Sequence, residues 1–142
     1  MDVTQGVLAH LVDDLADAVI ISDAEGIIRY WNGAAARVFG WSADEAIGQS
    51  LDLIIPEKQR PAHWAGYEKT METGITRYAD DLLRVPALNA DGQRHSIAFT
   101  VSLIPGDDGK PVGIAAVVRD ETERWAEEQS LRRTVRELSA ER

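Results

Sequence analysis

The sequence predicts an α+β fold, in which one antiparallel sheet carries short helices on one face and a further helix lies at each end of the chain. Three observations lead to this prediction. Apolar residues recur at helical spacing near the N-terminus, apolar and polar residues alternate strictly over 97–103, and turn residues separate pairs of apolar segments. The predicted order is helix, two strands, several short helices, three strands and helix, which fits one five-stranded sheet.

Composition limits the class of protein. The 142 residues suffice for one ordinary domain, and 44% hydrophobic with 27% charged residues is the balance of a globular protein. The net charge of −9 opposes binding to nucleic acid. The chain has no cysteine, which excludes disulfides and thiolate metal sites. The longest apolar run, 113–118, is too short to cross a membrane, and the acidic N-terminal segment lacks the pattern of a secretory signal, so we expect a cytoplasmic protein.

The N-terminal part predicts a helix followed by a hairpin. Within 1–16 one apolar face recurs at helical spacing and consists of Val7, Leu8, Leu11, Val12 and Leu15. The apolar segments 18–22 and 27–31 flank an acidic turn that contains Gly26. We therefore assign 1–16 to an amphipathic helix and begin the core domain at residue 17.

The middle of the chain predicts short helices. Asn32 and Gly33 end the hairpin, and a helix over 34–39 stops at Gly40. Ser42 followed by Glu45 has the spacing of a capping box. A longer helix is expected over 61–73, where Pro61 begins it and Gly74 ends it.

Three strands and a final helix are expected after residue 75. The segment 75–88 reads as extended, 97–103 alternates as a strand with one buried face, and 112–118 is an apolar strand that ends the core domain at residue 120. The last segment, 121–142, is charged and helical. Its Leu131, Val135 and Leu138 have the spacing of a short coiled coil.

Several local strings together resemble the PAS domain family of the S-box type over about 7–123. The strings are Asp23-Ala24-Glu25-Gly26-Ile27-Ile28 with Trp31-Asn32, the segment 36–49, Asp91-Gly92, and Val117-Val118-Arg119-Asp120-Glu121-Thr122-Glu123. The resemblance implies a five-stranded PAS fold and a sensory or interaction role. In this family the acidic residue after the last strand leads into an output helix, which assigns a signal relay to Asp120 and Thr122. From the residues alone, Asn32 and Asp120 are capping residues.

A second resemblance concerns the ligand. Ile55-Pro56-Glu57 followed by Arg60-Pro61-Ala62-His63 is similar to the haem-binding PAS domains of FixL-type kinases and direct oxygen sensor phosphodiesterases. The match implies haem b with His63 as the proximal iron ligand. It also implies distal and peripheral contacts, for which the sequence nominates Tyr67, Lys69, Arg77, Leu82, Arg84, Phe99 and Val101. The gas-stabilising arginine of those sensors aligns with Leu83, so the resemblance does not extend to oxygen sensing.

Other interpretations stay open at the sequence level. A single histidine beside Trp64 and Tyr67 is also typical of a packed residue, and His95 is expected at a solvent-facing strand end. The fold alone names no ligand, so an unknown small ligand or none are alternatives to haem. Flavin is disfavoured because the chain has no reactive cysteine.

No catalytic pattern is present. The paired carboxylates Asp80-Asp81 and Asp107-Asp108 read as solvated charge, and the sequence contains no phosphate-binding loop, serine elbow or multi-histidine metal spacing. We therefore expect a module that acts through association with an unknown downstream signalling protein.

A homodimer is expected through the terminal helices, with Leu8, Leu11, Leu15, Leu131, Val135 and Leu138 at the interface. The alternative is that both helices pack on their own sheet. Two function classes are expected. In a ligand sensor, occupancy of a pocket near His63 would alter the packing of Phe99, Val101 and Val117, and this change would pass through Asp120 into the last helix. In the second class, the chain is a ligand-free dimerisation module.

Overall fold

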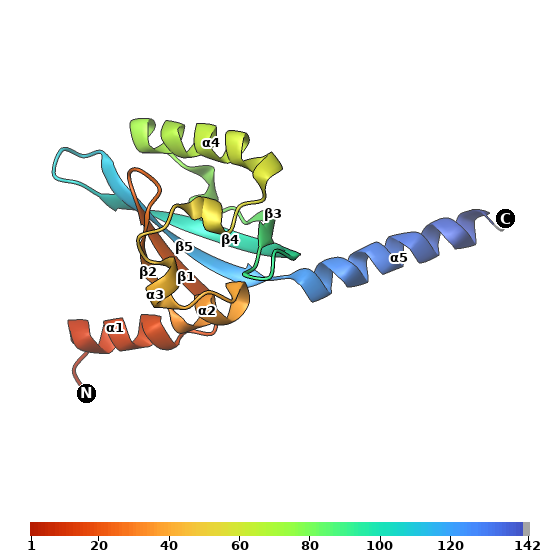
Figure 1. Cartoon of the computed structure of the whole chain (residues 1–142), viewed down its shortest axis with the longest axis horizontal. Helices are drawn as coiled ribbons and strands as arrows, with labels where there is room; N and C mark the ends of the chain where they lie inside the picture. Colours follow the sequence, from red (N-terminus) through yellow and green to blue (C-terminus); the bar gives the residue numbers. More distant parts are fainter. Residues whose placement is uncertain (141–142) are drawn as a thin grey trace.

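Five antiparallel strands form one sheet in the order β2-β1-β5-β4-β3, and the helices from the middle of the chain cover one of its faces (Figure 1). The computed structural model describes residues 1–140, apart from the side chain of Arg77. The strands are β1 (Ala18–Asp23), β2 (Ile28–Trp31), β3 (Leu83–Leu88), β4 (Arg94–Pro105) and β5 (Pro111–Asp120). The helices are α1 (Gln5–Asp14), α2 (Gly33–Phe39), α3 (Ala43–Ala46), α4 (Arg60–Thr73) and α5 (Thr122–Ala140), with 3₁₀ turns η1 (Leu51–Leu53), η2 (Glu57–Gln59) and η3 (Arg77–Ala79). The predicted fold class is confirmed.

The acidic turn between β1 and β2 closes the predicted hairpin. Oδ1 of Asp23 accepts hydrogen bonds from the backbone N–H groups of Glu25 and Ile27, both at 3.0 Å. Gly26 has a φ of 79°, which a residue with a Cβ adopts only at a cost. One carboxylate and one glycine therefore set the direction of the chain into β2.

Asn32 ties three elements together. Its Oδ1 accepts from the backbone N–H of Val19 at 2.9 Å and from that of Ala35, in the first turn of α2, at 3.0 Å. Its Nδ2 donates to the carbonyl oxygens of Val12 at 2.8 Å and Asp17 at 3.2 Å. The side chain is almost fully buried, and all of its bonding atoms are used. The capping role predicted for Asn32 is confirmed, and it also binds the chain that leads from α1 into β1.

The caps expected for the short helices are present. Ser42 and Glu45 form the reciprocal capping box at the start of α3. Gly40 ends α2 with a φ of 79°, and Gly74 ends α4 with a φ of 68°. The local signals therefore predicted these helix ends correctly.

The extended segment predicted over 75–88 is wrong in its first half. Residues 77–79 form the turn η3, and β3 begins only at Leu83. Because β3 is an edge strand, only one side of it pairs with β4. On its free side the N–H of Leu88 donates to the carbonyl of Ile54 at 2.9 Å, and Pro86, two positions earlier, has no N–H to leave unpaired.

The inner face of the sheet and the middle helices enclose one core. In β4 the alternation predicted over 97–103 directs Ile97, Phe99, Val101 and Leu103 into it. The opposite face is not entirely open, because Ala98 is only 1% exposed. The most completely buried large side chains are Phe39 of α2 and Ile28 of β2. Burial of this apolar surface is the main stabilising contribution to the fold.

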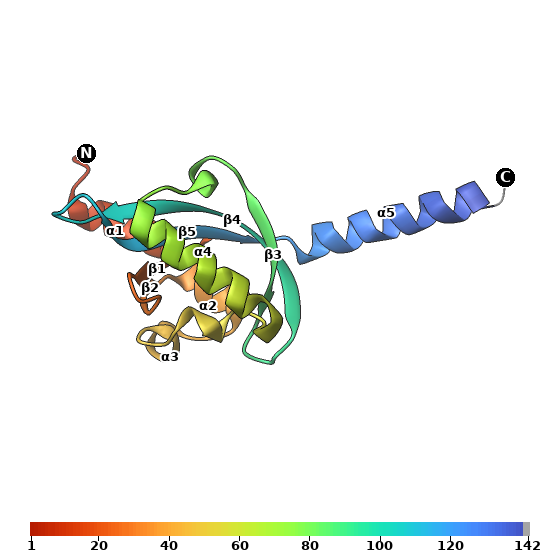
Figure 2. The same cartoon turned by 90° about the horizontal axis from the view of Figure 1, so that it is seen from above.

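The two terminal helices have no buried residues, and α5 projects away from the sheet (Figures 1 and 2). Leu8 and Leu11 of α1 are about half exposed, while Leu131, Val135 and Leu138 of α5 are more exposed still. The alternative in which both helices pack fully on their own sheet is therefore not observed. Within residues 1–140, none of the helices combines the length and apolar character needed to span a membrane.

Candidate ligand site

Helix α4 crosses the inner face of the sheet (Figure 2). Trp64 holds the N-terminal half of the helix in place. The indole Nε1 of Trp64 donates to Oδ1 of Asp52 at 2.8 Å. The indole ring lies against Gly26, where an added Cβ would approach the ring to 2.2 Å. The missing side chain at Gly26 therefore allows α4 to approach the β1–β2 hairpin.

His63 lies one residue before this anchor, on the buried side of α4. Its ring contacts those of Trp64 and Tyr67, with centroids 4.7 Å and 5.7 Å away. Among the described residues, its buried Nδ1 has no hydrogen-bond partner. Burial lowers the pKa of His63 below its ordinary value and outweighs the opposing charge of Asp52. The imidazole is therefore neutral near pH 7, with one ring nitrogen uncommitted.

Tyr67 lies one turn further along α4 and reaches β1. Its hydroxyl lies 2.8 Å from Oγ of Ser22 and donates to the carbonyl oxygen of Asp23 at 2.5 Å. Burial raises the pKa of Tyr67, so the hydroxyl stays protonated and available as a donor. This side chain fills part of the space between α4 and the hairpin.

The other side of the site is the inner face of β4. Phe99 and Val101 belong to the core cluster, together with Leu103 and the neighbouring Ala116 of β5. Leu83 pairs with Phe99 across β3 and β4. The wall that faces α4 is therefore apolar.

The structure places several nominated residues away from His63. Leu82, just before β3, lines a small pocket on the outer face of the sheet with Val117 of β5, and both side chains are exposed. Arg84 is also on the outer side, where its Nε lies 2.9 Å from Oε2 of Glu121. The assignments of Leu82 and Arg84 to the ligand site, and of Val117 to its inner packing, are corrected accordingly.

Lys69 and Arg77 are the two cationic residues that the resemblance to haem-binding PAS domains assigns to the periphery of the ligand. Lys69 is exposed on α4, on the side away from the buried stripe that contains His63 and Tyr67. The side chain of Arg77 lies outside the described part of the chain. Lys69 therefore supplies no cation at this site.

Sequence reasoning missed the polar groups that hold α4. Asp52 precedes the helix in η1, and Ser22 is a hydroxyl residue at the end of an otherwise apolar strand. A hydroxyl residue in an apolar strand was the available signal in the sequence. Ser22 is 3% exposed, and a buried hydroxyl needs a hydrogen-bond partner. Which partner it finds depends on tertiary packing, so the sequence could not identify Tyr67.

The predicted relay residues lie where β5 passes into α5. Oδ1 of Asp120 accepts from the backbone N–H of Thr122 at 2.9 Å and from its hydroxyl at 2.7 Å, which caps the helix. Burial raises the pKa of Asp120, but these bonds and the nearby His95 outweigh it and hold the pKa below its ordinary value. The Thr122 hydroxyl accepts from the N–H of Ser96 at 3.1 Å. The start of α5 is therefore attached to β4.

His95 differs from its predicted exposed position. Its side chain is only 9% exposed, and its Nδ1 lies 3.5 Å from Oδ2 of Asp120. The ring packs edge-on against Phe39, with centroids 5.5 Å apart. The reason is that β4 begins at Arg94, which puts His95 on the inner face in step with Ile97. His95 thus joins α2 to the start of α5.

The strand order and the helices over one face are those of a known family, whose model, described as the PAS fold, matches residues 7–121. The chain belongs to the PAS family. The recognition made from the sequence is therefore confirmed.

Curated relatives of this PAS domain include sensor proteins. The sensor protein FixL of Bradyrhizobium diazoefficiens is 30% identical over 138 residues, which cover 92% of this chain and 26% of FixL. The oxygen sensor protein DosP of Escherichia coli is 27% identical over 125 residues, covering 88% of this chain and 15% of DosP. The chain therefore spans about a quarter or less of the length of these relatives.

Solved PAS structures share the fold at low identity. A PAS domain from Colwellia psychrerythraea superposes with a TM-score of 0.72 at 23% identity and covers 82% of this chain and 95% of that one. An RNA-binding light-oxygen-voltage receptor gives a TM-score of 0.74 at 21% identity, covering 92% of this chain and 36% of that one. These likenesses establish the fold of the PAS domain.

The residues around His63 fit one part of a haem site. A neutral, buried imidazole with an uncommitted nitrogen is the donor that haem iron takes from a protein, and the facing wall of β4 is apolar. The hydroxyl of Tyr67, bonded to β1, narrows the space on the hairpin side. The site thus offers a buried imidazole and an apolar wall, while no cation is in place among the described side chains nominated for it.

Proposed function

We propose that this PAS domain is a sensor module that binds haem through His63, between α4 and the inner face of the sheet, and signals through α5. The single observation that carries the proposal is the buried Nδ1 of His63, which has no partner among the described residues. A buried polar atom without a hydrogen bond is costly, and a metal ligand is one of its few functional explanations. The relatives named as sensors agree with this role.

The protein's own residues have separate tasks in this proposal. His63 presents a neutral nitrogen because burial lowers its pKa. Trp64 holds the N-terminal half of α4 in position through Asp52. Phe99 and Val101 exclude water from the opposite wall. Haem held by His63 would supply an iron centre that can bind a further small ligand.

The inner face of β3 carries an apolar leucine where an oxygen sensor would need a hydrogen-bond donor, so we do not propose oxygen sensing. Leu83 lies opposite Phe99, whereas the adjacent Arg84 pairs with Glu121 on the outer side. A strongly polarised gas would need a hydrogen-bond donor beside it, and the apolar side chain of Leu83 offers none. We therefore propose a haem-linked sensor whose signal is other than a strongly polarised gas.

The route of output follows from contacts that join the core to α5. Phe39 of the core packs against His95, His95 approaches Asp120, and Asp120 caps the first turn through Thr122. Repacking of the core would shift this chain of contacts and change how α5 begins. This replaces the route through Val117, which lies on the outer face.

Dimerisation through α5 is the second part of the proposal. With Leu131 and Leu138 at d positions and Val135 at a, the pattern is that of a parallel two-stranded coiled coil. In that register Glu127 occupies a g position and Arg132 the e position that it meets in the partner helix, which gives opposite charges. Leu8, Leu11 and Leu15 of the N-terminal segment would extend the interface at the other end.

A ligand-free interaction module is the second candidate function. The bond between Tyr67 and Ser22 favours it, because it closes α4 onto β1 without a ligand. In this case the exposed faces of α1 and α5 are the functional surfaces, and the core only supports them.

An absorption spectrum after expression with added haem distinguishes the two functions. We expect a Soret band that His63→Ala abolishes. His95→Ala is the matched control, since His95 also has a buried ring nitrogen without a partner among the described residues but lies at the opposite end of the core. A colourless wild-type protein, or a band equally reduced in both variants, would contradict haem binding by His63.

We also propose that the chain acts in the cytoplasm by binding rather than by catalysis, and that its partner is a signalling protein recognised through α5. The acidic net charge of −9 supports a protein partner over nucleic acid or an anionic membrane surface.

A further inference from the structure

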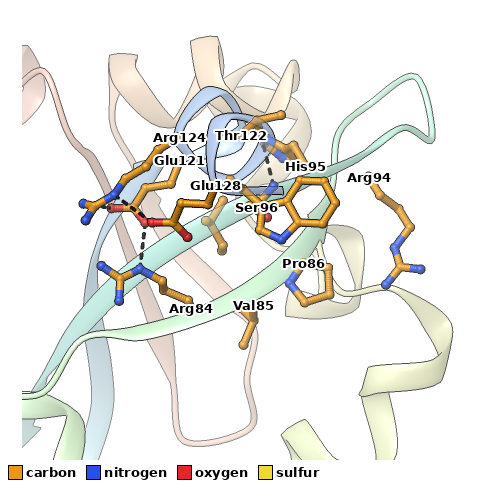
Figure 3. A pocket seen from close by; sticks show the side chains of 12 residues that line it. Arg84, Val85, Pro86, Arg94, His95, Ser96, Glu121, Thr122, Arg124 and Glu128 are labelled. Atoms are coloured by element: carbon orange, nitrogen blue, oxygen red, sulfur yellow. Dashed lines mark hydrogen bonds and ion pairs between the residues drawn. The ribbon is translucent and has the colours of Figure 1, made fainter. Parts of the chain in front are cut away.

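A groove of about 570 Å³ lies where the ends of β3 and β4 meet the first two turns of α5 (Figure 3). It is separate from the His63 site, and its volume is within the range of small-molecule sites. Its lining comes from three elements, which include Pro86 of β3, Arg94 and His95 of β4, and Arg124 and Trp125 of α5.

The groove has a different charge at each end. At one end Glu121 pairs with Arg84 at 2.9 Å and with Arg124 at 3.7 Å, and Arg124 also lies 3.4 Å from Glu128. Arg94 lies apart from this cluster in Figure 3 and has no ion pair within residues 1–140. In a chain with a net charge of −9, an unpaired guanidinium in a groove is a site for an anion.

Between the ends, the lining is apolar and aromatic. Trp125 exposes 52% of its surface, and Val85, Pro86 and Ile97 contribute further apolar atoms. An exposed tryptophan beside a proline suits a flat ring, which can stack on the indole face. The groove thus accepts a planar apolar group next to a negative charge.

The strand register brings several polar and apolar side chains of the groove to one face. Pro86 pairs with Ser96 and Arg84 with Ala98 across β3 and β4, so Arg84, Pro86, Arg94 and Ser96 share the outer face of the sheet. The ring of His95 points to the inner face, where it packs against Phe39.

We propose that this groove binds a small aromatic carboxylate, with the carboxylate on Arg94 and the ring between Pro86 and Trp125. Such a ligand contacts β3, β4 and α5 together, so it fixes the direction in which α5 leaves the sheet. The site therefore regulates the output helix independently of any ligand at His63.

The test is a titration of the full chain with naphthoate, followed by calorimetry and by amide chemical shifts. We expect saturable binding that shifts the amides of Arg94 and the indole N–H of Trp125. Arg94→Gln should weaken binding about tenfold, as loss of a charge-assisted hydrogen bond predicts. The neutral naphthamide should also bind about tenfold more weakly than the acid.

Two control variants distinguish binding in this groove from ligand binding at His63. Arg133→Gln lies on α5 outside the groove and should leave naphthoate affinity unchanged. His63→Ala should also leave it unchanged, whether or not the protein binds haem. Equal affinity for acid and amide, equal losses in Arg94→Gln and Arg133→Gln, or no saturation would overturn the proposal.

Discussion

The hydroxyl of Tyr67 on α4 lies 2.8 Å from Oγ of Ser22 on β1 and donates to the carbonyl oxygen of Asp23. This contact joins the longest helix over the sheet to the hairpin 45 positions earlier in the chain. It determines how closely α4 approaches the sheet and hence how much room remains beside His63.

Tyr67→Phe should lower the free energy of unfolding by about 1–3 kcal/mol, because it leaves the Ser22 hydroxyl buried without a partner. Urea denaturation measures the change. Tyr30→Phe is the control, since its hydroxyl bonds to Asp13 at the surface and should matter less. Equal losses in the two variants would show that the contact with β1 contributes nothing special.

Asn32→Leu should destabilise the protein by more than about 3 kcal/mol, because it leaves the N–H groups of Val19 and Ala35 and two carbonyl oxygens without partners. Asn32→Asp should recover only part of the loss, since a carboxylate accepts from the two N–H groups but donates nothing to Val12 and Asp17. Thermal unfolding compares the two variants. A larger loss for aspartate than for leucine would contradict this explanation.

Gly26→Ala and Gly48→Ala separate backbone strain from packing. Both glycines have positive φ, and alanine in that conformation costs about 1–2 kcal/mol. An added Cβ at Gly26 would also meet Trp64, whereas at Gly48 it meets nothing within 4 Å. We expect the larger loss of stability at Gly26, together with a change in Trp64 fluorescence isolated by replacing the other tryptophans. Identical losses would mean that Trp64 does not depend on this close approach.

The stability of the protein should depend on pH through His63. Its folded pKa lies below the ordinary value of 6.5, so the unfolded chain binds the proton more readily. The contribution is therefore complete above pH 6.5 and is lost as the pH falls through the folded pKa. His63→Gln should flatten the curve in this window, measured by urea denaturation at several pH values. A curve of unchanged shape in this variant would contradict the effect of burial on His63.

Leu131→Lys with Val135→Lys should convert the proposed dimer to a monomer without unfolding the core, since both side chains are exposed on a helix that has no buried residues. Sedimentation velocity measures the mass, and circular dichroism checks the fold. Ser130→Lys, on another face of the same helix, should not change the mass. A wild-type monomer, or a dimer that persists in the double variant, would remove α5 from the interface.

Local patterns predicted most of the fold. The alternation over 97–103, the capping box at Ser42 and the glycines at the ends of α2 and α4 act over a few residues, so the sequence displays them directly. The segment 75–88 was harder, because an edge strand pairs on one side only and its start depends on how far it follows β4, which here is as far as Phe99. His63 and Tyr67 share one face of α4, as helical spacing predicted, whereas Arg84 lies on the outer side of the sheet, which strand register decides.

The sequence by itself determined the resemblance to the PAS family, through local strings, and the helix that carries His63, through Pro61 and Gly74 at its ends. These signals lie within a few residues of one another, so they can be read before the chain folds. Only the tertiary structure decided that Tyr67 bonds to Ser22, that His95 is buried beside Asp120, and that Arg84, Arg94 and Arg124 line one groove. Such contacts join residues far apart in the chain, and their partners exist only after strand register and helix packing bring them together.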